Sequence, residues 1–410
     1  MSARDAWIID GVRTPRGKGK ATGSLHNIHP QELLATVLNA LRDRSGFDPV
    51  EVEDVIAGNG TQTGEHGADI ARLAVLTAGW PLETPGVSLN RFCGSGQTAV
   101  TWAAMGIMSG QQDLVIGSGV ESMSRWPTDN PVTLDAGNEN LRSKYPMVPQ
   151  GVSADLIATI EGFSRTDVDT FAVTSQERAA QAIAEKRFAG SVVPVYDLDG
   201  SLALDHDEFP RPGSTVETLS KLAPSFLEMG TKVLPGFEES FDDMCRRVYP
   251  QVGEIDHVHG PGNSSGVVDG ASALLLASPE YAKAQGWKPR ARIVQTALAG
   301  AEPVIMLTAP GPASQKCLAR AGMKVDDIDL WEINEAFAAV PMKTMRDLKI
   351  DPEKVNVNGG AIALGHPIGA TGGMLIQTAL DELERRDLQT ALITMCTGGG
   401  MGTATIIERV

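Results

Sequence analysis

The sequence is poor in cysteine, and the few cysteines that it has are far apart. They stand at positions 93, 245, 317 and 396 of a 410-residue chain, and no two of them form a Cys-x-x-Cys pair. This spacing argues against a disulfide framework and is typical of a protein in a reducing compartment.

Targeting and membrane-spanning segments are also lacking. The strand-like stretch Ala6–Asp10 begins within six residues of Met1, which leaves no room for a signal or transit peptide. No apolar run approaches membrane-spanning length, and the terminal Glu408-Arg-Val410 is not a peroxisomal tripeptide. We therefore expect a soluble, cytoplasmic protein.

Basic residues are in short supply as well. The chain has 35 lysines and arginines against 51 aspartates and glutamates, which gives a net charge of −16. Such an excess disfavours non-specific binding to nucleic acid or to a membrane surface. Glycine, in contrast, is plentiful: 44 glycines beside only 4 tyrosines, in a chain that is 42 % hydrophobic, favour an α/β protein with many tight turns. At this length we expect two or three domains.

Strand-like and helix-like segments alternate in both the first and the last part of the chain, which predicts largely parallel sheets covered by helices. Strands are expected at 7–10, 54–57, 86–89, 113–118, 291–296, 330–333, 355–358, 390–395 and 403–408, and helices at 31–42, 69–78, 96–109, 313–321, 337–348 and 369–386. The segment from Val87 to Gly117 resembles the segment from Val355 to Thr394 in its order of strand, glycine-rich turn, helix and strand. We interpret this as an internal duplication, with chance similarity as the alternative.

The middle of the chain differs in composition and shows less regular alternation of strands and helices. Residues 126–265 carry proline clusters at 126–131 and 209–213 and one strong helix at 166–187, which is typical of a cap carried by the first lobe. The expected domains are a first lobe of residues 1–125, completed by 269–289, an inserted loop domain of residues 126–268, and a second lobe of residues 290–410.

Cys93 lies in the stretch Asn90-Arg-Phe-Cys-Gly-Ser-Gly96, between an expected strand and an expected helix. A thiol at such a turn faces unpaired N–H groups and the positive end of the helix dipole, and both lower its pKa and favour the thiolate. The small residues that follow it leave space over the sulfur. We expect a nucleophile here, with an ordinary buried cysteine at a tight turn as the alternative.

Two more reactive side chains have glycine-rich settings. His366, in Gly365-His-Pro-Ile-Gly369, titrates near neutrality and can take the proton from a thiol. Cys396 is expected at an exposed strand end that opens Gly398-Gly-Gly400, where N–H groups are free to bind a developing oxyanion. Acyl transfer requires three such groups: one thiol to carry the acyl group, one imidazole to activate that thiol, and a second thiol to move another proton.

Polar residues at two other places invite a chemical interpretation. Asn334 and Glu335 follow the expected strand 330–333, where they would hold a water or orient the histidine; a helix cap is the alternative for Asn334. His257 and His259 have the spacing of two imidazoles on one strand face, but no third ligand is apparent, so we expect no metal.

Three further features are expected to be unconnected with chemistry. The basic stretch Arg16–Lys20 lacks the serine or threonine of a phosphate loop and is expected to be a solvated turn. Cys245 and Cys317 have no glycine setting, so we expect them to be bystanders.

Together these motifs resemble those of the thiolase family, the acetyl-CoA acetyltransferases and 3-ketoacyl-CoA thiolases. They are the settings of Cys93, His366 and Cys396, the stretch Asn334-Glu-Ala-Phe337, Gly117–Ser124, and Gly262–Gly266 leading into Asp269-Gly-Ala271. Their order is right, and the resemblance covers essentially the whole chain. It implies two duplicated βαβαβαββ lobes in a layered α/β core, with a CoA-binding loop domain inserted in the N-terminal lobe.

The resemblance also implies roles. Cys93 would be acylated, His366 would be its activating base, and Cys396 would remove or return a proton at Cα of acetyl-CoA. The N–H groups of Cys93 and Gly398 would stabilise one oxyanion, and His366 with a water held by Asn334 would stabilise the enolate. Beyond CoA and acyl-CoA as substrates, no cofactor is implied. The expected contacts to substrate are Ser265, at the pantetheine arm, and Gly151, Phe337, Lys221 and Arg211.

The sequence departs from the short-chain members of the family at three places. It has Pro149-Gln-Gly151 where those members usually have His-Met-Gly at the acyl pocket, it lacks an arginine in Lys221–Ser225, and it looks longer at 231–251. We hypothesise a pocket that accepts a substrate larger or more polar than acetoacetyl-CoA. Basic residues such as Arg211, Lys221 and Lys232 would offset the negative net charge around CoA.

The residues leave the direction of the reaction open, because one site runs condensation and cleavage; thiolysis is favoured thermodynamically, so a degradative role is expected. A biosynthetic acetoacetyl-CoA thiolase and a ketosynthase-like relative are alternatives, although Cys396 disfavours the second. A non-catalytic CoA-binding protein is the alternative from another class. The resemblance also implies a homodimer or homotetramer.

Overall fold

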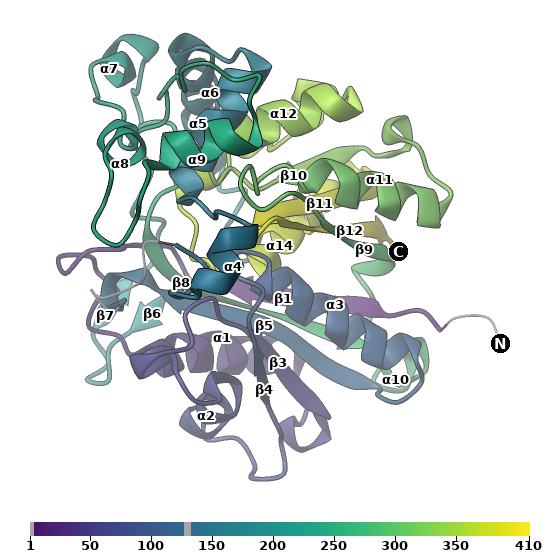
Figure 1. Cartoon of the computed structure of the whole chain (residues 1–410). Coiled ribbons are helices and arrows are strands. Elements are labelled where there is room, and N and C mark those ends of the chain that lie inside the picture. The colour runs from purple at the N-terminus through teal and green to yellow at the C-terminus, as the bar shows by residue number, and fades with distance from the viewer. Residues whose placement is uncertain (1–3, 127–132) are drawn as a thin grey trace.

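The computed structural model describes residues 4–126 and 133–410, and its strands form two lobes joined along one edge (Figure 1). The strands of the large sheet are β1 (Trp7–Arg13), β2 (Gly17–Lys18), β3 (Asp54–Gly58), β4 (Val87–Leu89), β5 (Leu114–Ser122), β8 (Val268–Ala277), β9 (Ala291–Gly300), β10 (Leu330–Ile333), β11 (Thr390–Thr397) and β12 (Met401–Arg409). Their order is β10-β11-β12-β9-β1-β8-β5-β3-β4, with β2 beside β8. The lobes meet where Trp7 and Ile8 of β1 pair with the start of β9.

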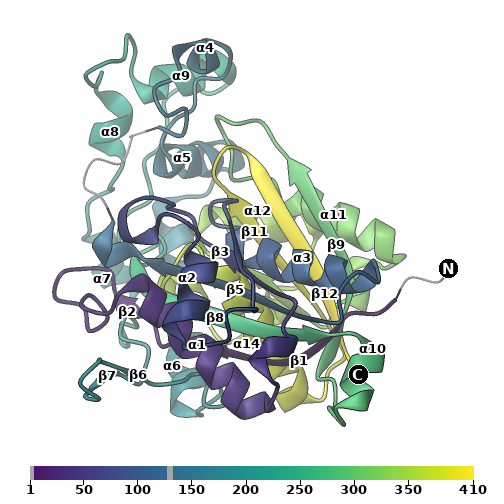
Figure 2. The same cartoon turned by 90° about the horizontal axis from the view of Figure 1, so that it is seen from below.

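Helices cover the outer faces of the lobes and fill the space between them (Figure 2). Between the lobes, α3 (Ser95–Met108) packs against α14 (Thr371–Arg386). On the outer side of the first lobe lie α1 (Pro30–Ser45) and α2 (Ile70–Thr77), and on that of the second lies α11 (Pro310–Ala321), with α12 (Ala339–Leu348) beside it. The small helices α10 (Pro279–Ala284) and α13 (Ala361–Leu364) complete these lobes. The layered α/β architecture that the sequence predicted is confirmed, but the expectation of largely parallel sheets is wrong. Among the described strands of the large sheet only β3 with β4, β3 with β5 and β10 with β11 pair in parallel, and the other pairs are antiparallel.

The two lobes repeat one strand order, which confirms the internal duplication. The first reads β4-β3-β5-β8-β1, and the second reads β10-β11-β12-β9 with Val355 bridged to the outer edge of β10. In both, the central strands are parallel (β3 with β5, β10 with β11) and the following pairs are antiparallel. The central helices α3 and α14 occupy equivalent places in the chain, since α3 lies between β4 and β5, and α14 lies between the Val355 bridge and β11.

The strand expected at 355–358 is wrong: only Val355 makes a bridge, to Trp331. Asn356 then turns the chain with a left-handed φ of 46°. Its side chain accepts from the Ile333 N–H and donates to the Ile333 carbonyl, both at 2.8 Å. A side chain therefore satisfies the edge of β10 where a backbone strand was expected, which frees the chain to turn toward the site.

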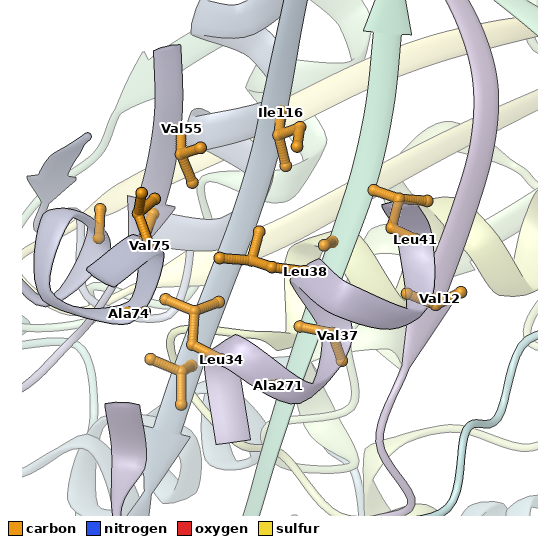
Figure 3. Packing of buried hydrophobic residues seen from close by; sticks show 14 of the residues in the cluster. Val12, Leu34, Val37, Leu38, Leu41, Val55, Ala74, Val75, Ile116 and Ala271 are labelled. Atoms are coloured by element: carbon orange, nitrogen blue, oxygen red, sulfur yellow. The ribbon is translucent and has the colours of Figure 1, made fainter. Parts of the chain in front are cut away.

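Helix α1 shows how the local sequence builds one layer. His29 accepts from the Gln31 N–H, Pro30 occupies the first turn, and Gly46 ends the helix in the left-handed conformation with φ of 70°. The face formed by residues 34, 37, 38 and 41 packs on Val12, Ile116 and Ala271 of the sheet (Figure 3). Burial of each large side chain contributes about 1.5–3 kcal/mol, so this spacing fixes which face of α1 meets the sheet.

The inserted segment contains α4 (Glu139–Lys144), α5 (Gln150–Glu161), α6 (Arg165–Ala184), β6 (Val195–Tyr196), β7 (Leu202–Leu204), α7 (Val216–Ser220), α8 (Leu227–Thr231) and α9 (Phe241–Val248). Its helices α5 to α9 lie at the upper left of Figure 1, whereas α4 lies near the centre and β6 and β7 lie lower, beside the first lobe. The helix expected at 166–187 is confirmed as α6, which a capping box of Ser164 and Asp167 opens. The expected proline cluster at 126–131 lies, except for Trp126, outside the described residues.

The expectation of a solvated turn at Arg16 is wrong, because Arg16 is buried and only Lys18 and Lys20 are exposed. Asp207 of the inserted segment accepts two bonds of 2.8 Å from the Arg13 guanidinium and one of 2.9 Å from the Arg16 N–H. This buried cluster links the insertion to β1.

Nowhere in 4–126 and 133–410 does a helix have the length and apolar character that crossing a membrane requires.

Candidate active site

Cys93 stands between β4 and α3, and its side chain is only 3 % exposed. The preceding Phe92 has a φ of +48°, a left-handed conformation that is uncommon for any residue other than glycine. Asn90 Oδ1 accepts from the Phe92 N–H at 2.7 Å, and the Ser95 hydroxyl donates to the Phe92 carbonyl at 2.6 Å. Such backbone strain costs about 1–3 kcal/mol and is often stored at functional sites. The turn is therefore built to present position 93.

The expected lowering of the Cys93 pKa is wrong. Burial raises the pKa of this thiol to about 11, and the nearby Glu121 carboxyl adds to the increase. The N–H groups of Gly398 and of Cys93 itself and the side-chain amide of Gln150 face the sulfur and oppose it. Loss of water around the thiolate outweighs the N–H groups at the start of α3. Cys93 is thus a thiol at rest and requires a base.

His366 is a buried imidazole whose tautomer follows from its contacts. The single hydroxyl proton of Thr371 is donated to the Pro367 carbonyl at 2.9 Å. Thr371 Oγ1 must therefore accept at its 2.6 Å contact with His366 Nδ1, which places the ring proton on Nδ1. Nε2 is left with the lone pair of the ring, which accepts from Asn334 Nδ2 at 3.3 Å. His366 is consequently arranged as a base at Nε2.

The charge state of His366 agrees with that role. Burial, and secondarily the nearby Arg16 guanidinium, lower the pKa of His366 to about 3. The imidazole is therefore neutral over the whole range in which proteins usually work and keeps a lone pair for a proton, although the same burial makes it a weak base in the resting site. Its loop also lies against the start of α3, since a Cβ added to Gly372 would come within 2.0 Å of Gln97 N.

Asn334 orients the histidine, as one of the two interpretations of the sequence proposed. The helix-cap alternative is wrong, because α12 begins only at Ala339 and its cap residue is Ala338. Asn334 Oδ1 is buried without a hydrogen-bond partner among the described residues, which suits the expected water. Glu335 turns away from His366 and accepts from Ser175, Asn356 and the Ile362 N–H.

Cys396 belongs to β11 and is fully buried, so the expected exposed strand end is wrong. It pairs with Gly402 of β12, and the covering by this hairpin explains the burial. Burial raises the pKa of Cys396 well above its ordinary range, and the nearby Cys93 raises it further. The two thiols therefore lie close together, each protonated at rest.

The hairpin turn after Cys396 carries Gly398 into the site. Gly399 and Gly400 have φ of 75° and 79°, which glycine adopts without strain. A Cβ added to Gly398 would come within 2.7 Å of Leu134 Cδ1 and 3.1 Å of Gln150 Nε2. Only glycine fits this position, and its N–H is thereby held toward the Cys93 sulfur.

Three of the expected substrate contacts lie beside this centre. Ser265 donates its N–H to the Ala336 carbonyl at 2.9 Å, so it adjoins the segment that begins at Asn334. Gly151 and Phe337 meet through Phe226: a Cβ on Gly151 would come within 2.2 Å of the Phe226 ring, whose centroid is 5.8 Å from that of Phe337. These rings form an apolar wall beside half-buried Ser265.

The two expected basic contacts lie farther out, and both are exposed. Arg211 stacks on the Phe209 ring at 4.8 Å, and that ring covers Gly266, next to Ser265. Lys221 pairs with Glu217 one turn earlier at 2.8 Å. Lys232, in the same way, pairs with Glu228. The structure therefore places Arg211 near the segment of Ser265 and leaves both lysines on the surface with acidic partners.

Three residues with contacts in the site were not assigned a role from the sequence. Thr371 fixes the tautomer of His366, Gln150 faces the Cys93 sulfur, and Glu121 holds the loop after His366. Glu121 Oε2 accepts from the N–H groups of Gly60 at 2.8 Å and Gly369 at 3.0 Å. A sequence signal was available for each, since Gln150 and Glu121 lie inside motifs noted above and Thr371 follows the glycine-rich stretch of His366 by two residues.

His257 and His259 do not point to a metal site, and no group of metal-ligating side chains occurs among the described residues. Asp155 accepts from the Nδ1 atoms of both histidines at 2.7 Å, and His257 Nε2 lies 3.1 Å from Asp242. Both nitrogens of His257 therefore face carboxylates. Although burial opposes it, Asp155 and Asp242 raise the pKa of His257 to about 9.

This cluster predicts a loss of stability at alkaline pH. Because the folded pKa of His257 lies above its usual 6.5, its contribution is complete below pH 6.5 and is lost as the pH rises through about 9. We expect on the order of 3 kcal/mol to be lost in this range, and less in Asp242→Asn. Urea unfolding at pH 6, 8 and 10 measures the free energy of unfolding, and Asp256→Asn, at the exposed neighbour of His257, is the control. If the free energy of unfolding fell equally with pH in Asp242→Asn and Asp256→Asn, the assignment to His257 would be contradicted.

Two family models match the sequence. "Thiolase, N-terminal domain" matches residues 6–236, and "Thiolase, C-terminal domain" matches residues 287–409. The solved acetyl-CoA acetyltransferase of Bacillus anthracis superposes with a TM-score of 0.83 at 33 % identity, covering 100 % of this chain and 99 % of that one.

Similar sequences include thiolases with different named substrates. The steroid 3-ketoacyl-CoA thiolase FadA6 of Mycobacterium tuberculosis is 40 % identical over 99 % of this chain and 94 % of its own length. The beta-ketoadipyl-CoA thiolase of Pseudomonas aeruginosa is 39 % identical over the full length of both. A 3-ketoacyl-CoA thiolase of Aeromonas hydrophila is 39 % identical over 99 % of this chain and 100 % of its own.

Proposed function

This chain belongs to the thiolase family and is an acyltransferase, and from that premise we propose that it cleaves 3-ketoacyl-CoA by thiolysis through an acyl group on Cys93. The observation that carries the proposal is that the Gly398 N–H, from the second lobe, faces Cys93, from the first, while the loop of the neutral His366 packs on the start of α3, directly after Cys93. A nucleophile, an oxyanion donor and a base therefore come from segments that pack around the same turn.

In the first half of the proposed reaction, His366 Nε2 takes the Cys93 proton and the sulfur attacks the C3 carbonyl. The N–H groups of Cys93 and Gly398 stabilise the oxyanion that forms. The C2–C3 bond then breaks, the acyl group stays on sulfur, and the electron pair remains on C2 of the acetyl-CoA enolate. Cys396 gives its proton to C2, while His366 and a water on Asn334 stabilise the enolate oxygen, and acetyl-CoA leaves.

In the second half, the sulfur of free CoA attacks the acyl carbonyl on Cys93. The proton of the CoA thiol goes to Cys396, and the departing Cys93 sulfur recovers its proton from His366. Both thiols are thus restored, and one 3-ketoacyl-CoA and one CoA have become acyl-CoA and acetyl-CoA. Ser265, which adjoins the site, is proposed to contact CoA, and so are Arg211 and Lys221, which lie farther out on the surface.

We propose a substrate larger or more polar than acetoacetyl-CoA and a degradative role. Aromatic rings of Phe226 and Phe337 with the Gln150 carboxamide give the site both apolar and polar walls. The 3-ketoacyl-CoA, steroid 3-ketoacyl-CoA and beta-ketoadipyl-CoA named for the relatives support this choice. We also propose a homodimer or homotetramer, which light scattering on the purified protein tests.

The chain length of the substrate is tested by steady-state thiolysis of acetoacetyl-CoA, 3-ketooctanoyl-CoA and 3-ketododecanoyl-CoA. We expect kcat/KM for at least one longer substrate to exceed that for acetoacetyl-CoA by about tenfold or more, because added methylenes gain contact with the aromatic wall. A higher kcat/KM for acetoacetyl-CoA than for every longer substrate would overturn the hypothesis of an enlarged pocket.

A further inference from the structure

Gln97 is a buried glutamine of α3, four residues after Cys93. Its Nε2 donates to the Ile393 carbonyl at 2.9 Å and to the Thr405 hydroxyl at 2.8 Å. Its Oε1 accepts from the Thr403 hydroxyl at 2.6 Å. Both polar atoms of the side chain are therefore bonded, and every partner belongs to the hairpin of β11 and β12 in the other lobe.

These partners lie close to the reactive part of the hairpin. β11 runs from Ile393 to Cys396 within three residues. The residue after the nucleophile, Gly94, packs directly on the same hairpin, since a Cβ added to it would come within 2.8 Å of Thr397 Cγ2 and 2.9 Å of Thr403 Cγ2. The turn of the nucleophile and the end of β11 thus meet across small side chains.

A contact between small side chains sets the separation of two segments, but it does little to stop them from sliding past each other. Hydrogen bonds are directional, so the bonds of Gln97 hold α3 in one register on the hairpin. In the part of the chain that the structure describes, no other residue of α3 makes a hydrogen bond to β11 or β12. The segment after His366 reaches the same residue, because a Cβ added to Gly372 would come within 2.0 Å of Gln97 N. Three segments of the site therefore converge on Gln97.

We propose that Gln97 is a positioning residue that sets the place of Cys396 and Gly398 relative to Cys93, a role that rests on the proposed acyl transfer at Cys93. Its bonds go to the hairpin and not to a reacting atom. Without them the hairpin can shift on α3, and the Gly398 N–H and the Cys396 thiol no longer match the acyl group on Cys93. A misplacement of about 1 Å in an active site can cost about 100-fold in rate.

The test replaces Gln97 by methionine, which keeps the length of the side chain and removes its amide. We expect kcat for thiolysis to fall about 10- to 100-fold, whereas KM changes less than about threefold. KM is spared because the aromatic wall of Phe226 and Phe337 is not bonded to Gln97. The matched control is Gln377→Met, since Gln377 is a buried glutamine of α14 that donates to the Gly11 carbonyl of β1. We expect this control to keep its kcat.

A second measurement needs no acyl-CoA. Dibromobimane forms one thioether with each of two thiols, with loss of a bromide at each, and it bridges them only when they lie close together. Peptide mass spectrometry gives the fraction of alkylated Cys93 that is bridged to Cys396. We expect this fraction to fall several-fold in Gln97→Met and to keep the wild-type value in Gln377→Met. Alkylation of the buried Cys317 in the same digest reports general loosening of the fold.

The bridged fraction decides the proposal. A lower fraction in Gln97→Met without alkylation of Cys317 supports it even if the wild type shows no thiolysis, a result that would overturn only the proposed function. A wild-type fraction in Gln97→Met would overturn the role of Gln97, whatever the rate of thiolysis. If this variant exposes Cys317 or melts at a lower temperature than Gln377→Met, Thr403→Val decides by the same criterion, because it keeps the shape of the side chain and removes the donor to Gln97 Oε1.

Discussion

Replacing Cys93 by alanine is expected to abolish thiolysis, with a loss in kcat of about 10⁴-fold or more. The residue presents the sulfur at a strained turn, among three N–H groups, and nothing else in the site can carry the acyl group there. Cys396 is the nearest other thiol, but it lies fully buried within β11. The measurement is incubation with acetyl-CoA and peptide mass spectrometry, which should show an acetyl group on the Cys93 peptide of the wild type alone.

The matched control for this substitution is Cys317→Ala. Cys317 is buried in α11, where its thiol donates to the Gln295 carbonyl at 3.4 Å, away from the site. We expect this variant to lose some stability and to keep its activity. An acetyl adduct on any other residue of the Cys93→Ala variant, together with residual turnover, would contradict the assignment of the nucleophile.

Replacing Cys396 by alanine is expected to separate the two chemical steps. Transfer of an acetyl group from acetyl-CoA to Cys93 breaks no carbon–hydrogen bond, so the adduct should still form, although more slowly because Cys396 no longer protonates the departing CoA sulfur. Turnover should fall about 10²- to 10⁴-fold, because the proton at Cα has lost its acid and base. Exchange of the methyl protons of acetyl-CoA with D₂O, followed by NMR, should fall by a similar factor.

Comparison of the two cysteine variants distinguishes the nucleophile from the acid and base at Cα. Cys93→Ala should lose the adduct, whereas Cys396→Ala should keep the adduct and lose proton exchange. A Cys396→Ala variant that exchanges protons at the wild-type rate would assign the base at Cα to another group. Cys396→Ser, with a less acidic group, should exchange more slowly than the wild type and distinguish proton transfer from packing.

Local sequence was sufficient for many of the elements and for the three reactive residues of the site, but not for the strand β8 or for Thr371, Gln150 and Glu121. Periodic apolar residues and capping residues predicted α1 and α6, and short apolar runs predicted β10 and β11, because these signals act within a few residues. Glycine-rich settings singled out Cys93, His366 and Cys396 for the same reason. The repeated order of strand, turn, helix and strand was enough to predict the duplication.

Only the tertiary structure decided how these residues behave. Cys93 and Cys396 were expected to be accessible, with a lowered pKa for Cys93, yet both are buried by segments far away in the chain. Arg16 looked like a surface residue because its partner, Asp207, comes from the insertion. The tautomer of His366 depends on Thr371, and the place of Gln150 depends on the packing of α5. Burial and hydrogen bonding are sums over distant neighbours, so the motifs named the chemical groups and the packing of the two lobes set their charge states.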